Sequence, residues 1–204
     1  MKRIILQIIS ALSVTILVSC STNRTYNPEN PSTKTSEVKM EANTNVGNID
    51  IPKDKPVDNL SAPKMKTYSN NLYSVSYPSD WLCAEHPNDF VDVAFGQQVG
   101  IAFSIFHVDI DASLSEIVES GNKDMKSQLG ATVLSYNKIK LCNVDAYKTV
   151  FSLRANGIDC KQISYTLKKG ATYYNVRFNG GVKDIDKNAE LIETIIQTFE
   201  LKTK

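Results

Sequence analysis

The chain has 204 residues, and its 23 lysine and arginine residues almost balance its 22 aspartate and glutamate residues. If Lys2 and Arg3 are removed with a leader, 21 basic residues remain against 22 acidic ones. This balance argues against a nucleic-acid-binding protein, which would show a clustered basic surplus. It equally provides no field that would attract anionic lipid or an acidic substrate.

The first 20 residues are organised like an export signal. Lys2 and Arg3 precede an apolar run of 15 residues, 4–18. A helix that spans a bilayer needs about 20 apolar residues, so this short N-terminal run is typical of a cleaved secretory signal. The end of the run, Leu17-Val18-Ser19-Cys20, looks like a bacterial lipobox, which implies cleavage after residue 19 and acyl chains such as palmitate on Cys20. An uncleaved anchor and a simple signal cut elsewhere remain the alternatives.

Residues 20–66 are predicted to be the lipidated cysteine and a disordered tether. Five of the seven prolines lie here, and Tyr26 is the only aromatic residue of the segment. Such a composition cannot bury enough apolar surface to offset the entropy of ordering the chain. A flexible coil of this length spans roughly 40 Å. We therefore expect an extracytoplasmic protein of the cell envelope, held to a membrane by lipid on Cys20.

The cysteine count limits the disulfides. The four cysteines are Cys20, Cys83, Cys142 and Cys160. If Cys20 carries lipid, at most one internal bridge can form among the other three, and the pairing stays open. The sequence contains no Cys-x-x-Cys, so a thioredoxin-type redox role is not expected.

Residues 67–204 are predicted to form one globular domain. Alternating apolar residues and turn signals predict strands over 72–77, 90–95, 99–108, 132–140, 145–155, 158–168 and 172–179. One helix is predicted to open at the capping box Ser113-Leu-Ser-Glu116 and to end at Gly130, and a second to cover 185–199.

The strongest turn signal is Asn156-Gly157, which favours a two-residue hairpin. Such a turn would place Val150 opposite Ile163 and Phe151 opposite Gln162. Large apolar groups then occupy both faces of the sheet, although one face is more mixed. The sequence therefore predicts an α+β fold, in which an antiparallel sheet of about six or seven strands lies between helices.

Two stretches of the domain resemble the PsbP-like family, named for an extrinsic subunit of the photosynthetic oxygen-evolving complex. They are Tyr73-Ser-Val-Ser-Tyr77-Pro78-Ser-Asp-Trp81 and the end of the last predicted helix, Ile195-Ile196-Gln-Thr-Phe199-Glu-Leu201. The resemblance implies α/β/α layers and a non-enzymatic binding or assembly role. It transfers no functional residue to this chain.

Two clusters contain possible metal ligands. Cys83-Ala-Glu-His86 offers sulfur, oxygen and nitrogen, all of which zinc accepts, and His107 is followed by Asp109 and Asp111. Neither cluster has a second ligand pair at a recognisable spacing. We therefore predict no metal or other cofactor, and leave open whether Cys83 and His86, or His107 and Asp109, bind a metal.

Catalytic signatures are weak. Ser135-Tyr-Asn-Lys138 matches Ser-x-x-Lys, but this serine falls in a predicted strand and the partner motifs of that enzyme class are missing. We therefore do not predict an enzyme. A cysteine and a histidine brought together in a cleft would raise that possibility.

The predicted strands carry many tyrosines, which suit either sheet packing or an interface. They are Tyr73, Tyr77, Tyr136, Tyr147, Tyr165, Tyr173 and Tyr174. The leading functional hypothesis is a non-catalytic module that binds or assembles with an unidentified protein, and an exposed apolar or tyrosine patch would favour it. The alternative is a lipoprotein that binds a small ligand in a pocket between sheet and helix. An enclosed cavity with a few convergent polar groups would favour that alternative.

Overall fold

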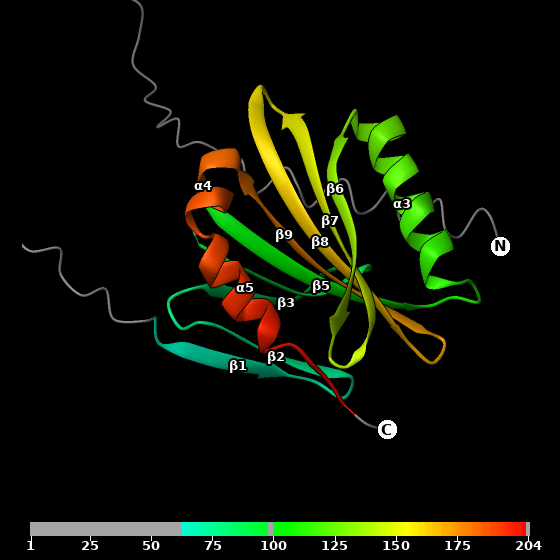
Figure 1. Ribbon diagram of the computed structural model, residues 1–204. Coiled ribbons are helices and arrows are strands. Elements are labelled where there is room, and N and C mark those ends of the chain that lie inside the picture. The colour runs from blue at the N-terminus through cyan, green and yellow to red at the C-terminus, as the bar shows by residue number, and fades with distance from the viewer. Residues whose placement is uncertain (1–62, 98–99, 203–204) are drawn as a thin grey trace, which may run out of the picture. The chain divides into compact units, whose positions relative to one another are not determined.

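A computed structural model describes residues 63–97 and 100–202 (Figure 1). The predictions for the signal peptide, for Cys20 and for nearly all of the tether lie outside the described residues. Within those residues the elements, in chain order, are β1 (Met65–Ser69), β2 (Tyr73–Pro78), β3 (Leu82–Asn88), β4 (Val91–Gly96), β5 (Ile101–Asp109), α3 (Leu114–Leu129), β6 (Thr132–Leu141), β7 (Val144–Ala155), β8 (Ile158–Lys169), β9 (Thr172–Gly181), α4 (Val182–Lys187), α5 (Ala189–Gln197) and β10 (Glu200–Leu201).

The strands form two antiparallel sheets. The larger sheet has seven strands in the order β3-β4-β5-β9-β8-β7-β6, and the smaller has three in the order β1-β2-β10. The predicted α+β fold class, an antiparallel sheet of about seven strands between helices, is confirmed. None of the helices within 63–97 and 100–202 has the length and apolar character needed to cross a membrane.

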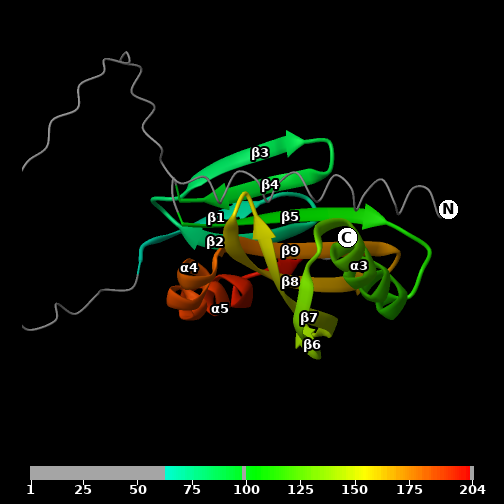
Figure 2. The ribbon, with the colours of Figure 1, turned by 90° about the horizontal axis from the view of Figure 1, so that it is seen from above.

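The two faces of the large sheet pack against different elements. On one face, Tyr165 and Phe178 join the main core with α4, α5 and the small sheet. On the other face, Phe151 and Leu153 pack against Met125 of α3. Because successive residues of a strand point to opposite faces, α3 and the α4–α5 pair cover opposite sides of the same strands. Figure 1 shows this arrangement, and Figure 2 shows α3 well apart from α4 and α5.

The structure contains the hairpin turn and the helix caps that the sequence predicts. Asn156 and Gly157 have φ angles of 51° and 80°, as the predicted hairpin turn requires. Val150 lies opposite Ile163 and Phe151 opposite Gln162, so the predicted register is confirmed. Ser113 and Glu116 form the capping box of α3, and Gly130 ends the helix with a left-handed φ of 62°.

Three strands were not predicted from the sequence. Strand β1 begins at Met65, so the predicted domain start at Thr67 falls inside it. Strand β3 is exposed along its whole length and therefore lacks the apolar alternation that marks a half-buried strand. Strand β10 has only two residues. Phe90, predicted to begin a strand, lies at the turn before β4 and is exposed.

The predicted helix over 185–199 is in fact two helices, α4 and α5, separated by Asn188. The side chain of Asn188 donates from Nδ2 to the carbonyl oxygen of Asp184 over 2.8 Å. Such a local hydrogen bond competes with the regular backbone hydrogen bonds of a helix, which is why asparagine favours helix ends. The apolar stripe survives the break, since Ile185, Ile192 and Ile196 are all buried.

Candidate functional site

The fold brings one of the predicted clusters and part of the other into a single polar groove. Cys83, Glu85 and His86 of β3 line it, together with Asp92 of β4 and His107 of β5. The groove has a volume of about 740 Å³. We refer to it as the polar groove.

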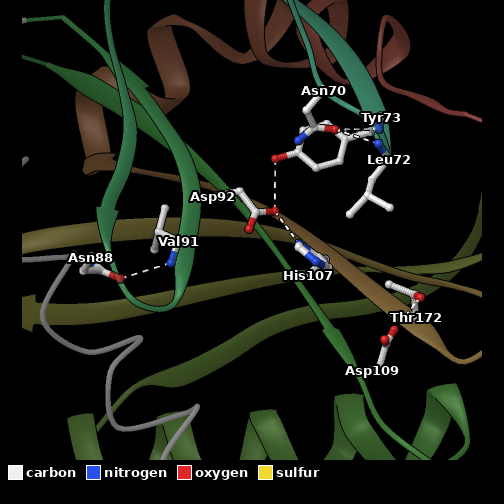
Figure 3. Close-up of polar contacts among 9 residues, drawn as sticks. All are labelled: Asn70, Leu72, Tyr73, Asn88, Val91, Asp92, His107, Asp109 and Thr172. Carbon is white, nitrogen blue, oxygen red and sulfur yellow. Dashed lines mark hydrogen bonds and ion pairs between the residues drawn. The ribbon is translucent and has the colours of Figure 1, made fainter.

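Asp92 is the centre of a hydrogen-bonded cluster at the polar groove, in which Asp92 and Tyr73 are buried and His107 is exposed (Figure 3). Its Oδ2 accepts a hydrogen bond from the Tyr73 hydroxyl at 3.1 Å, and His107 Nδ1 lies 2.7 Å from the same oxygen. Burial, reinforced by the charge of Asp92, raises the pKa of Tyr73. The three residues come from β2, β4 and β5, so the cluster connects the small sheet to the large one.

Among the described residues, one cysteine, Cys83, lines the polar groove. Burial raises the pKa of Cys83, whereas a nucleophilic cysteine requires a lowered pKa.

The two aspartates of the second possible metal cluster lie apart from the polar groove. Asp109 accepts a hydrogen bond from the Thr172 hydroxyl at 2.5 Å, and Asp111 is exposed in the turn before α3. Within the described part of the chain, no three histidine, cysteine or acidic side chains are arranged to hold a metal ion.

The three cysteines among the described residues are free thiols. Cys83 is exposed, Cys142 is half-buried and Cys160 is buried. The Cys142 thiol donates to the carbonyl oxygen of Phe199 at 2.8 Å, which fixes the end of α5 against the β6–β7 turn. The one bridge that the cysteine count allowed is not formed among these three.

Packing accounts for most of the strand tyrosines. Tyr73, Tyr165, Tyr173 and Tyr174 are buried, and only Tyr136 is classed as exposed. Ser135 of the Ser-x-x-Lys match lies in strand β6, as the sequence predicts, and not at the start of a helix.

A second site lies between α3 and the large sheet. This cavity of about 110 Å³ has mainly apolar walls, including Phe106 of β5, Ile117 and Met125 of α3, and Phe151 of β7. We refer to it as the α3 cavity. It lies on the opposite face of the sheet from the main core.

The floor of the α3 cavity is polar. Gln162, Ser164 and Thr166 alternate along β8, and Asn175 and Arg177 alternate along β9. Asn175 Nδ2 donates to Ser164 Oγ and to Thr166 Oγ1, each at 2.7 Å. Gln162 Oε1 and Asn175 Oδ1 are buried, and no donor among the described residues reaches either oxygen. Buried polar atoms normally have a hydrogen-bond partner, so the lack of a donor at these two oxygens needs an explanation.

Arg177 adds a buried positive charge to the same floor. Its guanidinium lies over the Phe106 ring, 5.4 Å from the ring centre. Burial lowers the pKa of Arg177 to about 9, which still leaves it protonated at neutral pH. Among the described residues that line the α3 cavity, none is acidic.

Gly121 of α3 leaves room above this floor. It lines the α3 cavity, and a Cβ added there would meet no atom within 4 Å. A glycine inside a helix costs about 1 kcal/mol relative to alanine. Gly121 therefore lowers the stability of α3 at a position where a larger side chain would project into open space.

The residues of the α3 cavity were not identified from the sequence as a site. The available signal was the run of polar residues, Gln162, Ser164 and Thr166, that alternates with apolar ones along β8. That alternation alone is equally typical of a strand with one face in water. Only the packing of α3 over this face shows that the polar side chains are buried.

No protein-family model and no curated protein matches the chain. Its fold does match solved structures. The solution structure of cyanobacterial PsbP (CyanoP) from Synechocystis sp. PCC 6803 aligns with a TM-score of 0.56 and 12% identity, over 71% of this chain and 96% of that chain. A Pseudomonas aeruginosa protein of unknown function, PA94, aligns with a TM-score of 0.48 and 14% identity, over 69% and 99% of the two chains.

LpqN of Mycobacterium tuberculosis, described as involved in cell envelope biogenesis, aligns with a TM-score of 0.42 and 8% identity, over 72% of this chain and 88% of that chain. The alignments with PA94 and LpqN are too distant to support an argument. The alignment with CyanoP agrees with the resemblance found in the sequence. The domain of this chain therefore has the PsbP-like fold.

Proposed function

We propose that the chain is a lipid-anchored, extracytoplasmic binding protein of the bacterial cell envelope, which holds a small molecule in the α3 cavity and catalyses no reaction. The observation that carries this proposal is a pair of buried oxygens, Gln162 Oε1 and Asn175 Oδ1, that have no donor within 63–97 and 100–202 and lie beneath a helix with space at Gly121. An unpaired buried polar group costs about 1–3 kcal/mol, which a ligand with hydrogen-bond donors would offset.

We favour a small ligand over the protein partner that was the leading hypothesis from the sequence. The tyrosines that suggested a protein interface are mostly buried. The cavity, in contrast, has apolar walls and a few convergent polar groups, as small-molecule sites usually do. Its volume is below that of a drug-sized site, so the ligand should be small.

Water is the other possible occupant of the α3 cavity. A volume of about 110 Å³ has room for three or four molecules, since each takes about 30 Å³ in the liquid. Water could also satisfy the two oxygens. The test must therefore distinguish an organic ligand from bound water.

Native mass spectrometry on protein released from the cell envelope makes that distinction. Three proteins are compared: the wild type, Gly121→Leu, which fills the space beneath α3, and Gly121→Ala, which keeps most of it. A small molecule that accompanies the wild type and Gly121→Ala but not Gly121→Leu would support the proposal. Bare protein mass in all three, from cells that contain the natural ligand pool, would contradict it.

The anchoring part of the proposal is carried by the lipobox at Leu17–Cys20. One acyl chain holds a protein to a membrane only reversibly, whereas two or more give stable attachment. Cells fed a clickable palmitate analogue should label the wild type, and Cys20→Ala should lose both the label and its place in the membrane fraction. Equal labelling of the two proteins would show that the lipid is elsewhere or absent.

A second candidate function is binding of a protein partner along β6. This strand is one edge of the large sheet, and Leu134 on it is 56% exposed. Its neighbour Tyr136 stacks on Tyr147, with ring centres 4.9 Å apart and an interplanar angle of 6°. An edge strand with exposed apolar side chains can pair with an extended segment of another protein.

A crosslinking pull-down from the cell envelope tests this second candidate. Leu134→Asp should remove a β6 partner, while Leu82→Asp, an equally exposed leucine on the opposite edge strand β3, should retain it. A Cys20→Ala control shows whether the capture depends on the membrane. The same partner captured by Leu134→Asp would exclude docking at β6.

A further inference from the structure

The chemistry of the α3 cavity narrows its ligand to one class. We propose that it selects a neutral, planar molecule whose edge carries adjacent N–H and C=O groups, as in an aromatic amide or a cyclic amide. This inference rests on the proposed function, and it goes further by assigning a role to each polar group of the floor.

The ligand must supply hydrogen-bond donors. Gln162 Oε1 and Asn175 Oδ1 can only accept, and both are buried without a donor among the described residues. Asn175 Nδ2 donates its two N–H groups to Ser164 Oγ and Thr166 Oγ1. Asn175 Oδ1 is therefore the atom left to accept from a ligand.

The floor also offers donors to a ligand acceptor. Arg177 lines the same floor, and a guanidinium has five N–H groups in a fixed plane. It can therefore donate to a ligand carbonyl in addition to its other contacts. A molecule with an N–H beside a C=O matches this floor, since the N–H faces an amide oxygen and the C=O faces Arg177.

Charge excludes the two other ligand classes of similar size. A cationic amine would be buried beside Arg177 with no acidic residue among the described lining residues, and like charges repel strongly in a poorly solvated site. A carboxylate would be attracted to Arg177 but would face the two amide oxygens with no proton to give them. A neutral molecule avoids both penalties.

The size and walls of the α3 cavity indicate a single ring. An apolar cavity of 150 Å³ is known to hold benzene. The α3 cavity is smaller, about 110 Å³, so a ring bound there would extend into the opening to solvent. Phe106, Ile117 and Phe151 form apolar walls on which a flat ring can lie. Gly121 keeps the space above the floor free.

Binding of four matched compounds tests this inference: benzamide, benzoate, benzylamine and toluene. The protein is the mature chain with Cys20→Ala, which carries no acyl chain, and dissociation constants are measured by ligand-observed NMR. Fragments of this size bind with roughly millimolar affinity. Benzamide should bind about tenfold more tightly than the other three, which is the effect of one satisfied buried hydrogen bond.

Two variants locate the binding. Gln162→Leu should weaken benzamide about tenfold and leave toluene unchanged or tighter, because only benzamide uses the Gln162 oxygen. Gly121→Leu should abolish binding of both compounds, and Gly121→Ala should retain it. Circular-dichroism melting of each variant confirms that it is folded.

The outcomes separate this inference from the proposed function. If toluene, benzoate or benzylamine binds more tightly than benzamide, and Gly121→Leu blocks that binding, the proposed ligand class is wrong. The proposed small-molecule-binding function then still stands. No binding of benzamide would also overturn the class, and the native mass spectra would then decide the function alone. Benzamide binding that survives in Gly121→Leu would place the compound at another site and overturn the inference.

Discussion

Asn175 on β9 donates a hydrogen bond from Nδ2 to Ser164 Oγ on β8 across 2.7 Å. This contact joins two neighbouring strands on the face that α3 covers. The oxygen of the same amide, Asn175 Oδ1, is buried and has no donor among the described residues. The same local arrangement therefore stabilises the sheet and leaves an acceptor at the floor of the α3 cavity.

Removing one unpaired acceptor should make the unliganded protein more stable. We expect Gln162→Leu to raise the free energy of unfolding by about 1 kcal/mol, because the buried Gln162 oxygen has lost its water without gaining a partner. Urea unfolding of the unliganded protein measures the change. Gln128→Leu on the exposed side of α3 is the control and should change stability by no more than about 0.5 kcal/mol. A loss of stability in Gln162→Leu would show that its oxygen is well satisfied.

The same substitution at two glycines of the α3 region should have opposite effects. Gly121→Ala should raise stability by about 1 kcal/mol, because alanine is the better helix former and its Cβ meets no atom within 4 Å. Gly130→Ala should lower stability by about 1 kcal/mol, because Gly130 has a left-handed φ of 62° that alanine adopts at a cost. Thermal or urea unfolding of both variants checks the two signs. Destabilisation by Gly121→Ala would mean that α3 packs more tightly over the floor than described.

Alkaline pH should destabilise the fold through its buried tyrosines. Burial raises the pKa of Tyr73 and of Tyr165 above the ordinary value of 10.0, and the carboxylates of Asp92 and Glu193 raise them further. Below pH 10 both phenols are protonated in the folded and unfolded states, so their contribution to the free energy of unfolding is fully present. Above pH 10 the unfolded chain releases protons that the folded chain keeps, so stability falls by up to about 1.4 kcal/mol per pH unit for each tyrosine.

Urea unfolding between pH 8 and 11.5 checks this pH dependence. Tyr165→Phe should flatten the alkaline decline, because it removes one of the linked protons. Tyr136→Phe should flatten the decline over this range as well, because burial raises the pKa of Tyr136 to about 12. A decline of unchanged slope in Tyr165→Phe would contradict the assigned role of this phenol.

Thiol reactivity should follow burial. In the native protein we expect a disulfide reagent such as DTNB to modify Cys83 first, because it is the exposed cysteine. The reaction should be slower than with a fully solvated thiol such as that of glutathione, since partial burial of the sulfur raises the pKa of Cys83 and lowers its thiolate fraction. In guanidinium chloride three thiols per lipidated chain should react. A count of one would reveal a disulfide among Cys83, Cys142 and Cys160.

Local signals in the sequence predicted the parts of the fold that short-range interactions determine. The Asn156-Gly157 turn fixed the pairing of Phe151 with Gln162, and the capping box fixed the start of α3 at Ser113. Strand β3 was beyond such signals, because it is exposed and pairs as an edge with β4. The division of the last helix at Asn188 was missed because the apolar stripe continues across it.

The candidate site was harder to predict than the fold. Gly121, Gln162 and Asn175 come from α3, β8 and β9, and only the tertiary packing brings them around one cavity. The sequence did indicate a mixed face of the sheet, yet a polar floor under a helix and a polar surface in water have the same pattern. Which of the two occurs depends on how α3 docks, and periodicity does not determine that.

The most direct test of the central claim is a crystal structure of the protein isolated from its own cell envelope, at a resolution that shows ordered water. The account predicts continuous density for a ring-sized molecule in the α3 cavity, within hydrogen-bond distance of Gln162 Oε1 and Asn175 Oδ1. Separate water peaks bonded to these oxygens, or α3 closed onto the sheet with no space left beneath Gly121, would contradict it.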